Sequence, residues 1–476
     1  MAKRRKLALP DDRPASFDES GHHVDLTAEY AQGRFRRRRD WVYLALVIVF
    51  LVIPWTKFQG HQTILLDIPG RRFAFFGITF WSHDFPLVFF ALGIITMSVT
   101  FMTAVWGRIW CGWACPQTVF IDFIYRRIEK WVEGNRYQRL KLAEASMSWS
   151  KLGKRSLKWI LFWLVSANIA HSFTAYFVGA ERLAGMSIAS PWDNWVPFVF
   201  VSSLTIILMF DFGWFREQFC MIMCPYGRFQ SVLLDEDSLA VLYDDGRGEP
   251  RKGEQPEGQD HGDCINCFKC VAVCPTGIDI RRGIQLECVA CTACIDACDS
   301  VMEQIGKPEG LIRYATESEV AGGPKRRYFR FRTIAYGLIL AMLVAGLSVA
   351  VTQRQILDVK FIRAVGAPYT ETTLPDSGVH IINHYKVNLK NQSFETQEVE
   401  LMLDDKASAD GVEIVAPTYP LSIDGGEVVK NSVFLKFPKS LTKGSGNYHM
   451  FLVIKATSDQ SKTTFAEEVK LIGPFS

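Results

Sequence analysis

The sequence predicts a multidomain membrane protein in three parts: an α-helical bundle, a small cysteine-rich domain and an all-β C-terminal domain. Apolar residues form 49% of the 476-residue chain but are concentrated in a few long runs. All 12 cysteines lie at or before Cys298. After Val351 the sequence changes to short stretches in which apolar and polar residues alternate, which is typical of half-buried β-strands. A chain of this length is expected to form several domains.

Five apolar stretches are candidates to cross a bilayer, which requires about 20 helical residues each. They are Trp41–Phe58, Phe85–Trp106, Trp159–Gly179, Trp195–Trp214 and Thr333–Val351. The first is short and contains Pro54, and proline tends to end or kink a helix. We expect four of these helices in a membrane domain at residues 41–232 and the fifth at residues 333–351.

The segments between these stretches predict which side of the membrane each occupies. Lys and Arg are abundant in residues 1–40, 107–158 and 215–332, and rare in residues 59–84 and 180–194. The positive-inside rule assigns basic segments to the cytoplasm. We therefore expect a multi-pass protein of the bacterial cytoplasmic membrane, in contact with lipid, whose N-terminus lies inside.

Two basic or charged segments are expected beside the membrane. Arg36–Arg39 directly precede an apolar run, so we interpret residues 1–40 as a cytoplasmic flank and expect no nucleic acid partner. Residues 122–150 have the pattern of an amphipathic helix on the membrane surface, although a solvated helix is an equal alternative. The apolar side of that helix would carry Ile124, Ile128, Trp131 and Val132.

Residues 264–298 contain two cysteine runs of the bacterial iron–sulfur type, each with spacings of two, two and three residues. In such runs the fourth cysteine is a ligand of the other cluster. The sequence thus predicts two 4Fe–4S clusters. Their ligands would be Cys264, Cys267, Cys270 and Cys298 for the first, and Cys288, Cys291, Cys294 and Cys274 for the second.

Structural zinc is the alternative for these runs, because a spacing of two residues also suits zinc. Zinc motifs, however, usually come as separated pairs. The second run has Asp299 where the first has Pro275, and we expect its cluster to survive because that proline only shapes the backbone. We expect a linker at residues 233–262 and a cytoplasmic ferredoxin-like domain at residues 263–332.

The other four cysteines form two matched motifs, each placed after an apolar stretch at the cytoplasmic surface. They are Cys111-Gly-Trp-Ala-Cys115-Pro116 and Cys220-Met-Ile-Met-Cys224-Pro225. Cysteines four residues apart would share one helix face, and the proline would bend the backbone just after them. The match predicts an internal duplication that brings four thiols together.

Three roles for these four thiols remain open. They could hold a further cluster or a structural metal, act as a thiol–disulfide relay, or bind a soft metal, because thiolates and thioethers select Cu(I). Met221 and Met223 slightly favour copper. His171, alone in its apolar stretch, is expected in a packed, hydrogen-bonded core role. No glycine-rich dinucleotide or phosphate motif is present, which argues against NAD(P)H, flavin and ATP.

Taken together, these features resemble the cytochrome oxidase accessory proteins called CcoG, FixG or RdxA. The resemblance covers nearly the whole chain: the five expected membrane helices, the two Cys-x3-Cys-Pro motifs, the two cluster runs and the sandwich of residues 352–476. That sandwich is predicted independently, because about seven alternating stretches in about 120 residues indicate an immunoglobulin-like fold. An odd number of crossings places it in the periplasm. The clearest stretches are Ile381–Leu389, Glu398–Leu403, Val412–Val415, Val428–Phe437 and Tyr448–Ala456.

The resemblance implies a cupric reductase that assists assembly of cbb3-type oxidase, with electrons from the clusters and copper as substrate or bound ion at four thiols. Those thiols belong to Cys111, Cys115, Cys220 and Cys224. The implied partners are oxidase assembly factors or copper chaperones and an unidentified electron donor, and dimerisation remains open. The alternatives are a quinol-oxidising membrane ferredoxin subunit, like those serving periplasmic nitrate reductases, and a non-enzymatic assembly scaffold.

Overall fold

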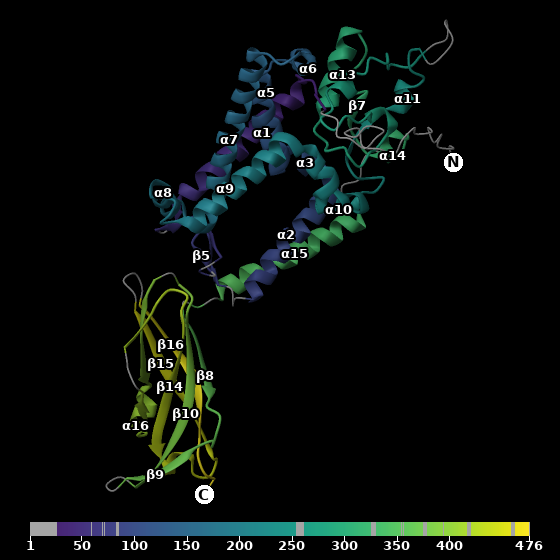
Figure 1. Ribbon diagram of the computed structural model, residues 1–476. Coiled ribbons are helices and arrows are strands. Elements are labelled where there is room, and N and C mark those ends of the chain that lie inside the picture. The colour runs from purple at the N-terminus through teal and green to yellow at the C-terminus, as the bar shows by residue number, and fades with distance from the viewer. Residues whose placement is uncertain are drawn as a thin grey trace. The chain divides into compact units, whose positions relative to one another are not determined.

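The computed structural model divides the chain into two compact units, Met1–Leu65 with Phe89–Gly346, and Leu66–Val88 with Leu347–Ser476 (Figure 1). The residues described are 26–58, 60–68, 70, 72–81, 85–253, 261–324, 330–353, 355, 357–374, 378–393, 395–416, 420–457 and 462–475.

Four helices in the described part of the chain are long and apolar enough to cross a membrane. They contain the stretches Leu87–Trp106, Trp149–Val178, Trp195–Phe215 and Phe331–Thr352. The corresponding elements are α2 (Phe85–Trp106), α7 (Trp149–Val178), α9 (Trp195–Phe210) with a π-helical turn after it, and α15 (Phe331–Thr352). Many of their large apolar side chains are exposed, among them Ile95, Ile207 and Leu338, as expected of surfaces that face lipid.

The predicted membrane bundle is thus confirmed, but the count of five helices is approximate. The first predicted span, Trp41–Phe58, lies in α1 (Arg34–Val52), which is apolar only from Trp41 onward. A 3-10 turn that contains Pro54 follows it directly. The apolar part of α1 is therefore shorter than the about 20 residues that a spanning helix requires.

Helix α1 nevertheless packs into the membrane domain. Its Val47 and Phe50 contact an aromatic core of buried residues from α4 (Pro116–Phe120), α7 and the π-helical turns Ile121–Tyr125 and Asp211–Phe215. That core contains Phe120, Ile121, Tyr125, Phe162, Ile169 and Phe212. The hydroxyl groups of Tyr125 and Ser166 lie 2.6 Å apart, which satisfies both polar groups inside the core.

The predicted surface helix at 122–150 is broken into shorter elements. They are the π-helical turn Ile121–Tyr125, α5 (Arg126–Val132) and α6 (Arg136–Glu144). Gly134, between α5 and α6, has a φ of 95°, a conformation that favours glycine and ends the helix. Ile124 and Ile128 pack against the aromatic core, whereas Trp131 is 85% exposed, so only part of the predicted apolar side is buried.

The cysteine-rich domain is small and held by one antiparallel strand pair, β6 (Ala240–Tyr243) with β7 (Ile312–Ala315). Val241 and Tyr243 of β6 belong to its buried core. The linker predicted at 233–262 therefore ends earlier, because a four-residue strand is too short to be recognised by its alternation. The other elements are α11 (Asp245–Gly248), α12 (Lys269–Ala272), α13 (Ala293–Gln304) and α14 (Glu317–Val320).

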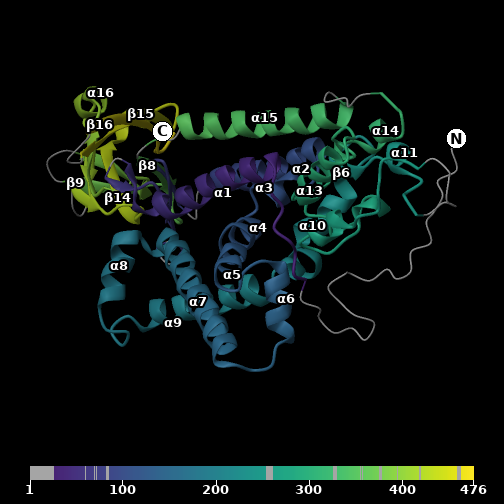
Figure 2. The same cartoon turned by 90° about the horizontal axis from the view of Figure 1, so that it is seen from above.

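The first turn of α1 is anchored to α13 of the cysteine-rich domain (Figure 2). The Asp296 carboxylate accepts hydrogen bonds from the backbone N–H groups of Phe35 (3.0 Å) and Arg36 (2.7 Å). These N–H groups have no partner within α1 because they lie at its N-terminus, and a carboxylate there is favoured by the helix dipole. The contact joins the membrane domain to the cluster domain.

The second unit contains a sandwich of two antiparallel sheets, which confirms the prediction. The first sheet has the order β12-β14-β10-β8, with β9 paired to β10, and the second has the order β13-β11-β15-β16. All five predicted stretches lie in or overlap strands. The strands are β8 (Leu357–Arg363), β9 (Thr370–Leu374), β10 (Gly378–Asn391), β11 (Gln397–Leu403), β12 (Glu413–Val415), β13 (Leu421–Ile423), β14 (Val428–Pro438), β15 (Asn447–Thr457) and β16 (Lys462–Ile472).

Short strands also occur between α1 and α2. They are β1 (Lys57–Phe58), β2 (His61–Gln62), β3 (Ile64–Asp67), β4 (Arg72–Phe75) and β5 (Ile78–Trp81). β1 pairs with β2, and β3, β4 and β5 form a three-stranded sheet in that order. These strands, which lie between the first two apolar stretches, are not among those predicted from the sequence.

Candidate iron–sulfur and thiol sites

The two cysteine runs adopt the same unusual backbone conformation. Asn266 and Phe268, on either side of Cys267, have φ values of 58° and 55°. Ala290 and Thr292, at the same places around Cys291, have φ values of 52° and 63°. Left-handed conformations are costly for residues other than glycine. Their repetition at matched positions indicates a geometric requirement that both runs share.

The structure brings the eight cysteines of these runs together as two crossed sets. One cavity is lined by Cys264, Cys267, Cys270 and Cys298. A second is lined by Cys274, Cys288, Cys291 and Cys294, and Cys270 also contributes to its lining. The fourth cysteine of each run thus joins the first three of the other, as the 4Fe–4S pattern predicts.

The donor sets fit 4Fe–4S clusters. Burial raises the pKa of the Cys270 thiol to about 11, and that of Cys288 to about 12. Buried thiolates need a positive partner to ionise, and iron supplies one. Within the described residues, no three His, Cys, Asp or Glu side chains converge closely enough to hold a single metal ion.

Asp299, which replaces the proline of the first run, has a structural role of its own. Its carboxylate accepts hydrogen bonds from the backbone N–H of Gly310 (2.9 Å) and from the guanidinium of Arg34 (3.0 Å). These contacts hold the residue beside Cys298 without a proline. The departure from the sequence pattern is therefore compensated by a charged interaction.

The second cysteine of each Cys-x3-Cys-Pro motif lies outside the helix of the first. Cys111 lies in α3 (Ile109–Trp113) and Cys220 in the π-helical turn Phe219–Met223. Cys115 and Cys224 precede α4 and α10 (Pro225–Leu233) in extended conformations. The expectation of a shared helix face was wrong, because the residue before a proline is restricted to extended conformations.

The two motifs contact each other reciprocally, as the predicted duplication requires. The Cys111 thiol lies 3.4 Å from Oε1 of Gln230, which follows the second motif. Gln117, which follows the first motif, donates through Nε2 to Oδ1 of Asp211 (2.9 Å) in the second repeat. Burial raises the pKa of Cys111 to about 11, and the neighbouring Cys115 and Cys224 thiols contribute to the shift.

Four thiols are thus gathered at one place, but they do not form a closed single-ion site. In the described part of the chain, no three metal-binding side chains converge closely enough to hold a single ion. Burial, followed by the Cys115 thiol, the Glu217 carboxylate and the Cys111 thiol, also raises the pKa of Cys220 strongly. A cationic metal centre is the kind of occupant that would allow these buried thiols to ionise.

The first motif lies directly on the loop of the second cluster run. Trp113 Nε1 donates to the Tyr314 hydroxyl (3.0 Å), which in turn donates to the carbonyl of Ala290 (3.2 Å). Nη1 of Arg108 donates to the carbonyls of Leu286 and Cys288. The first motif is therefore a neighbour of the loop that carries the predicted ligands of the second cluster. We call the thiols of Cys111, Cys115, Cys220 and Cys224 the membrane-surface thiols.

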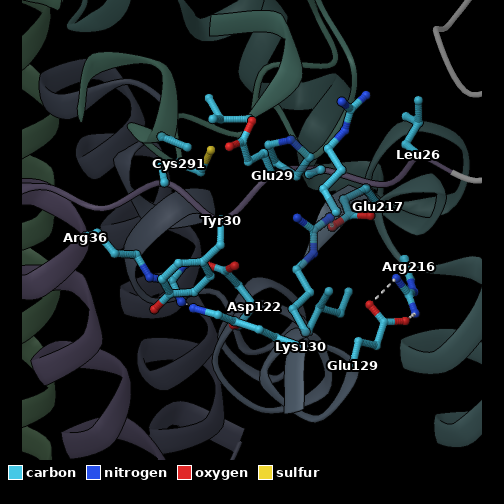
Figure 3. A pocket seen from close by; sticks show the side chains of 18 of the residues that line it. Leu26, Glu29, Tyr30, Arg36, Asp122, Glu129, Lys130, Arg216, Glu217 and Cys291 are labelled. Carbon is cyan, nitrogen blue, oxygen red and sulfur yellow. Dashed lines mark hydrogen bonds and ion pairs between the residues drawn. The ribbon is translucent and has the colours of Figure 1, made fainter. Parts of the chain in front are cut away.

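A charged cavity of about 380 Å³ has both Cys220 and Cys291 in its wall (Figure 3). The Asp122 carboxylate lies in it, 2.6 Å from Nη1 of Arg36 and 2.5 Å from Nη2 of Arg39. Burial alone would raise the pKa of Asp122, but these guanidinium groups lower it well below its ordinary value. Within the predicted membrane flank Arg36–Arg39, Arg36 and Arg39 are thus buried in ion pairs inside the protein.

A second buried carboxylate in this cavity is Glu129, which is paired with Arg216 and, at 2.9 Å, with Arg139. Burial opposes its ionisation, yet Arg216 and Arg139 lower its pKa to about 2. Figure 3 shows the Glu129–Arg216 pair at the edge of the cavity. Sequence reasoning missed Asp122 and Glu129, although an acidic residue in the apolar pattern of 119–132 is a usable signal.

His171 and the methionines are less constrained than expected. His171 is exposed, not packed in a core, and its Nδ1 lies 2.8 Å from the carbonyl of Ala167 one turn earlier in α7. Met223 is 62% exposed. The structure therefore brings neither His171 nor Met223 into a closed metal site.

Family models match three parts of the chain. A 4Fe-4S dicluster domain matches residues 215–317, a 4Fe-4S binding domain matches residues 87–136, and the "IG-like fold at C-terminal of FixG" matches residues 347–474. Protein RdxA of Cereibacter sphaeroides is 36% identical over 390 residues, which cover 79% of this chain and 81% of that protein. The chain belongs to the FixG/RdxA family.

Two further comparisons are less complete. The nitrogen fixation protein FixG of Rhizobium meliloti is 40% identical over 303 residues, which cover 61% of this chain and 57% of that protein. A crystal structure of a FixG-related protein from Vibrio parahaemolyticus aligns with 25% of this chain and 97% of its own, with 14% identity and a TM-score of 0.18. Family membership and the cluster domains identify this FixG/RdxA member as a membrane iron–sulfur electron-transfer protein.

Proposed function

We propose that this FixG/RdxA protein reduces Cu(II) to Cu(I) at its four membrane-surface thiols, for assembly of a cbb3-type cytochrome c oxidase. One observation carries the proposal: the Cys111–Cys115 motif is in direct contact with the loop that bears Cys288 and Cys291. Thiols that bind Cu(I) would thus lie beside a one-electron source. The 4Fe–4S clusters, when bound, supply single electrons.

The chain's own residues favour the reduced ion. Thiolates are soft ligands and bind Cu(I) in preference to harder ions, so thiols at Cys111, Cys115, Cys220 and Cys224 stabilise the product. One electron converts one Cu(II) to one Cu(I), and an electron donor outside this chain replaces that electron.

The proposed setting is the bacterial cytoplasmic membrane, with the cluster domain in the cytoplasm and residues 352–476 in the periplasm. Basic flanks support this orientation through the positive-inside rule. A periplasmic sandwich would be available to oxidase assembly factors or copper chaperones. Protein purified anaerobically and titrated with Cu(II) should form Cu(I), detected with a Cu(I)-specific chelator. Failure of reduced, cluster-loaded protein to form Cu(I) would overturn the proposal.

A second candidate function has a specific observation in its favour. The 4Fe-4S binding model covers residues 87–136, where Cys111 and Cys115 are the only cysteines. Together with Cys220 and Cys224 they would complete a third cluster, and the chain would then carry electrons from a membrane quinol to a partner reductase. Iron analysis separates the candidates, because two clusters need about eight iron atoms per chain and three need about twelve.

A further inference from the structure

The cavity that has Cys220 and Cys291 in its wall is large enough for a small molecule. Its volume is about 380 Å³, within the range of small-molecule sites. The acidic side chains in the wall are mostly satisfied within the protein. Asp122 and Glu129 form the ion pairs described above, Glu217 accepts from Arg126 at 2.5 Å, and Asp296 caps α1. These carboxylates are therefore occupied and offer little to a cation.

In contrast, some basic side chains in the wall have N–H groups without a hydrogen-bond partner in the described part of the chain. Seven basic residues line the cavity against five acidic ones. Arg39 is only 2% exposed, and its Nε and Nη1 have no hydrogen-bond partner in the part of the chain that the structure describes. Nε of Arg126 is unpartnered in the same sense. Buried donors without acceptors are costly, so these groups favour an acceptor that is not among the described residues.

Two further basic groups line the cavity from exposed positions. Nζ of Lys130 lies over the Tyr30 ring, 4.0 Å from its centre, and Nε of Arg136 donates to the carbonyl of Thr27 at 2.8 Å. Neither residue has an acidic partner among the described residues. In Figure 3, the Tyr30 ring lies between Arg36 and Lys130. The cavity therefore combines buried guanidinium groups with two exposed cations.

We propose that this cavity binds a small polyanion bearing carboxylate or phosphate groups. Guanidinium groups bind such oxyanions with paired, charge-assisted hydrogen bonds, and Arg39 and Arg126 provide donors for them. Because the cavity has a net positive lining, a free divalent cation is disfavoured there. The proposal goes beyond copper reduction and does not depend on which metal the four thiols hold.

The position of the cavity means that a bound anion would act on nearby redox groups. Cys220 belongs to the membrane-surface thiols and Cys291 to the second cysteine run, and both lie in the same wall. A negative charge at this place acts on both redox groups at short range, where the interior dielectric screens it little. Occupancy of the cavity is thus expected to lower the reduction potential of the adjacent cluster.

The test uses full-length protein in detergent at constant ionic strength. We expect saturable binding of citrate or pyrophosphate by calorimetry, with one site per chain. Lys130→Gln and Arg136→Gln should each weaken binding about tenfold, the loss of one charge-assisted interaction. Lys141→Gln is the matched control, because Lys141 lies on the same helix as Arg136 but does not line the cavity, and it should leave binding unchanged.

Two results would overturn the proposal: the absence of saturable binding by either anion, or an equal loss of affinity in Lys141→Gln, which would indicate general surface charge. Arg39→Lys keeps the buried charge but removes donors, and it should also weaken binding if the protein remains folded by circular dichroism. Binding measured in lipid nanodiscs distinguishes a lipid headgroup from a soluble anion as the natural ligand. If phosphatidylglycerol, unlike phosphatidylcholine, displaces pyrophosphate, the natural occupant is a lipid headgroup and not a soluble anion.

Discussion

Gly112 and Ala290 touch through their backbones. A Cβ atom at Gly112 would lie 2.4 Å from the carbonyl oxygen of Ala290, closer than any such contact can be. Gly112 lies between Cys111 and Cys115, and Ala290 lies between Cys288 and Cys291. The Tyr43 hydroxyl also donates to the carbonyl of Gly112. A glycine is therefore required where the membrane-surface thiols meet the second cluster run.

Gly112→Ala should disturb electron transfer more than cluster content. The added methyl group must push the thiol motif from the cluster loop, and overpacking of this kind costs about 1–3 kcal/mol. We expect a lower melting temperature, nearly normal iron content and slower Cu(II) reduction. Gly153→Ala is the control, because nothing lies within 4 Å of a Cβ there. Equal rates in the two variants would show that the close contact is unimportant.

Replacement of the fourth cysteines should damage the clusters in a crossed manner. Cys274 lines the cavity of Cys288, Cys291 and Cys294, so Cys274→Ala should impair the second cluster. Cys298→Ala should impair the first for the same reason. Electron paramagnetic resonance of protein reduced anaerobically resolves the two clusters. If Cys274→Ala instead matches Cys264→Ala in its spectrum, each run holds its own cluster.

Substitution of the membrane-surface thiols and substitution of the cluster thiols should impair different properties of the protein. Cys111→Ala or Cys224→Ala should weaken copper binding and copper reduction and leave iron content unchanged. Cys291→Ala should retain copper binding and lose the electron supply. Copper titration and iron analysis of the same preparations measure both effects. If Cys111→Ala loses iron together with cluster signal, its thiol is a cluster ligand and the quinol-oxidising candidate is favoured.

Asp122→Asn should strongly destabilise the protein. The change leaves Arg39 buried without its ion-pair partner and leaves Arg36 with only Asp40, at 3.1 Å, and loss of one partner of a buried ion pair costs about 3–5 kcal/mol. We expect a lower melting temperature and weakened contact between α1 and the membrane domain, measured by limited proteolysis. Asp193→Asn, at an exposed position, should have no such effect. A similar loss in both variants would contradict the role of the buried pair.

Low pH should reduce the stability of the same region, because Glu129 becomes protonated. Its folded-state pKa is lowered from 4.5 to about 2 by Arg216 and Arg139, against the effect of burial. A lowered pKa means that the folded state binds the proton less tightly than the unfolded state. The stabilisation is therefore complete above about pH 4.5 and is lost as the pH falls toward 2. Melting temperatures of the parent and Glu129→Gln across this range should converge at low pH.

The orientation of the C-terminal sandwich is open to direct measurement. The basic flanks, together with five crossings, predict that the N-terminus lies inside and residues 352–476 lie outside. Alkaline phosphatase, which is active only in the periplasm, should be active when fused after Ser476 and inactive when fused at Gln259. The reverse result would reject the topology, and it would also bear on α1, whose short apolar part decides the parity of crossings.

The local spacing of residues explains why much of this protein's structure can be predicted from its sequence. Two cysteine runs separated by a few residues can form only a few arrangements, and the crossed grouping around Cys274 and Cys298 follows from that spacing. The strands of the sandwich can likewise be predicted, because apolar and polar side chains alternate along each strand. The long apolar runs of α2, α7, α9 and α15 needed no tertiary information at all.

Only the tertiary structure decided which residues that are distant in the chain contact one another. The pairing of Arg36 and Arg39 with Asp122, the contact of Gly112 with Ala290 and the pairing of β6 with β7 leave no periodic or spacing signal. Each depends on which surfaces are buried against one another, and burial makes a charge or a glycine indispensable only after the chain has folded. The sequence by itself determined the parts of this protein and their metal-binding residue types, and the fold decided how the two redox motifs meet.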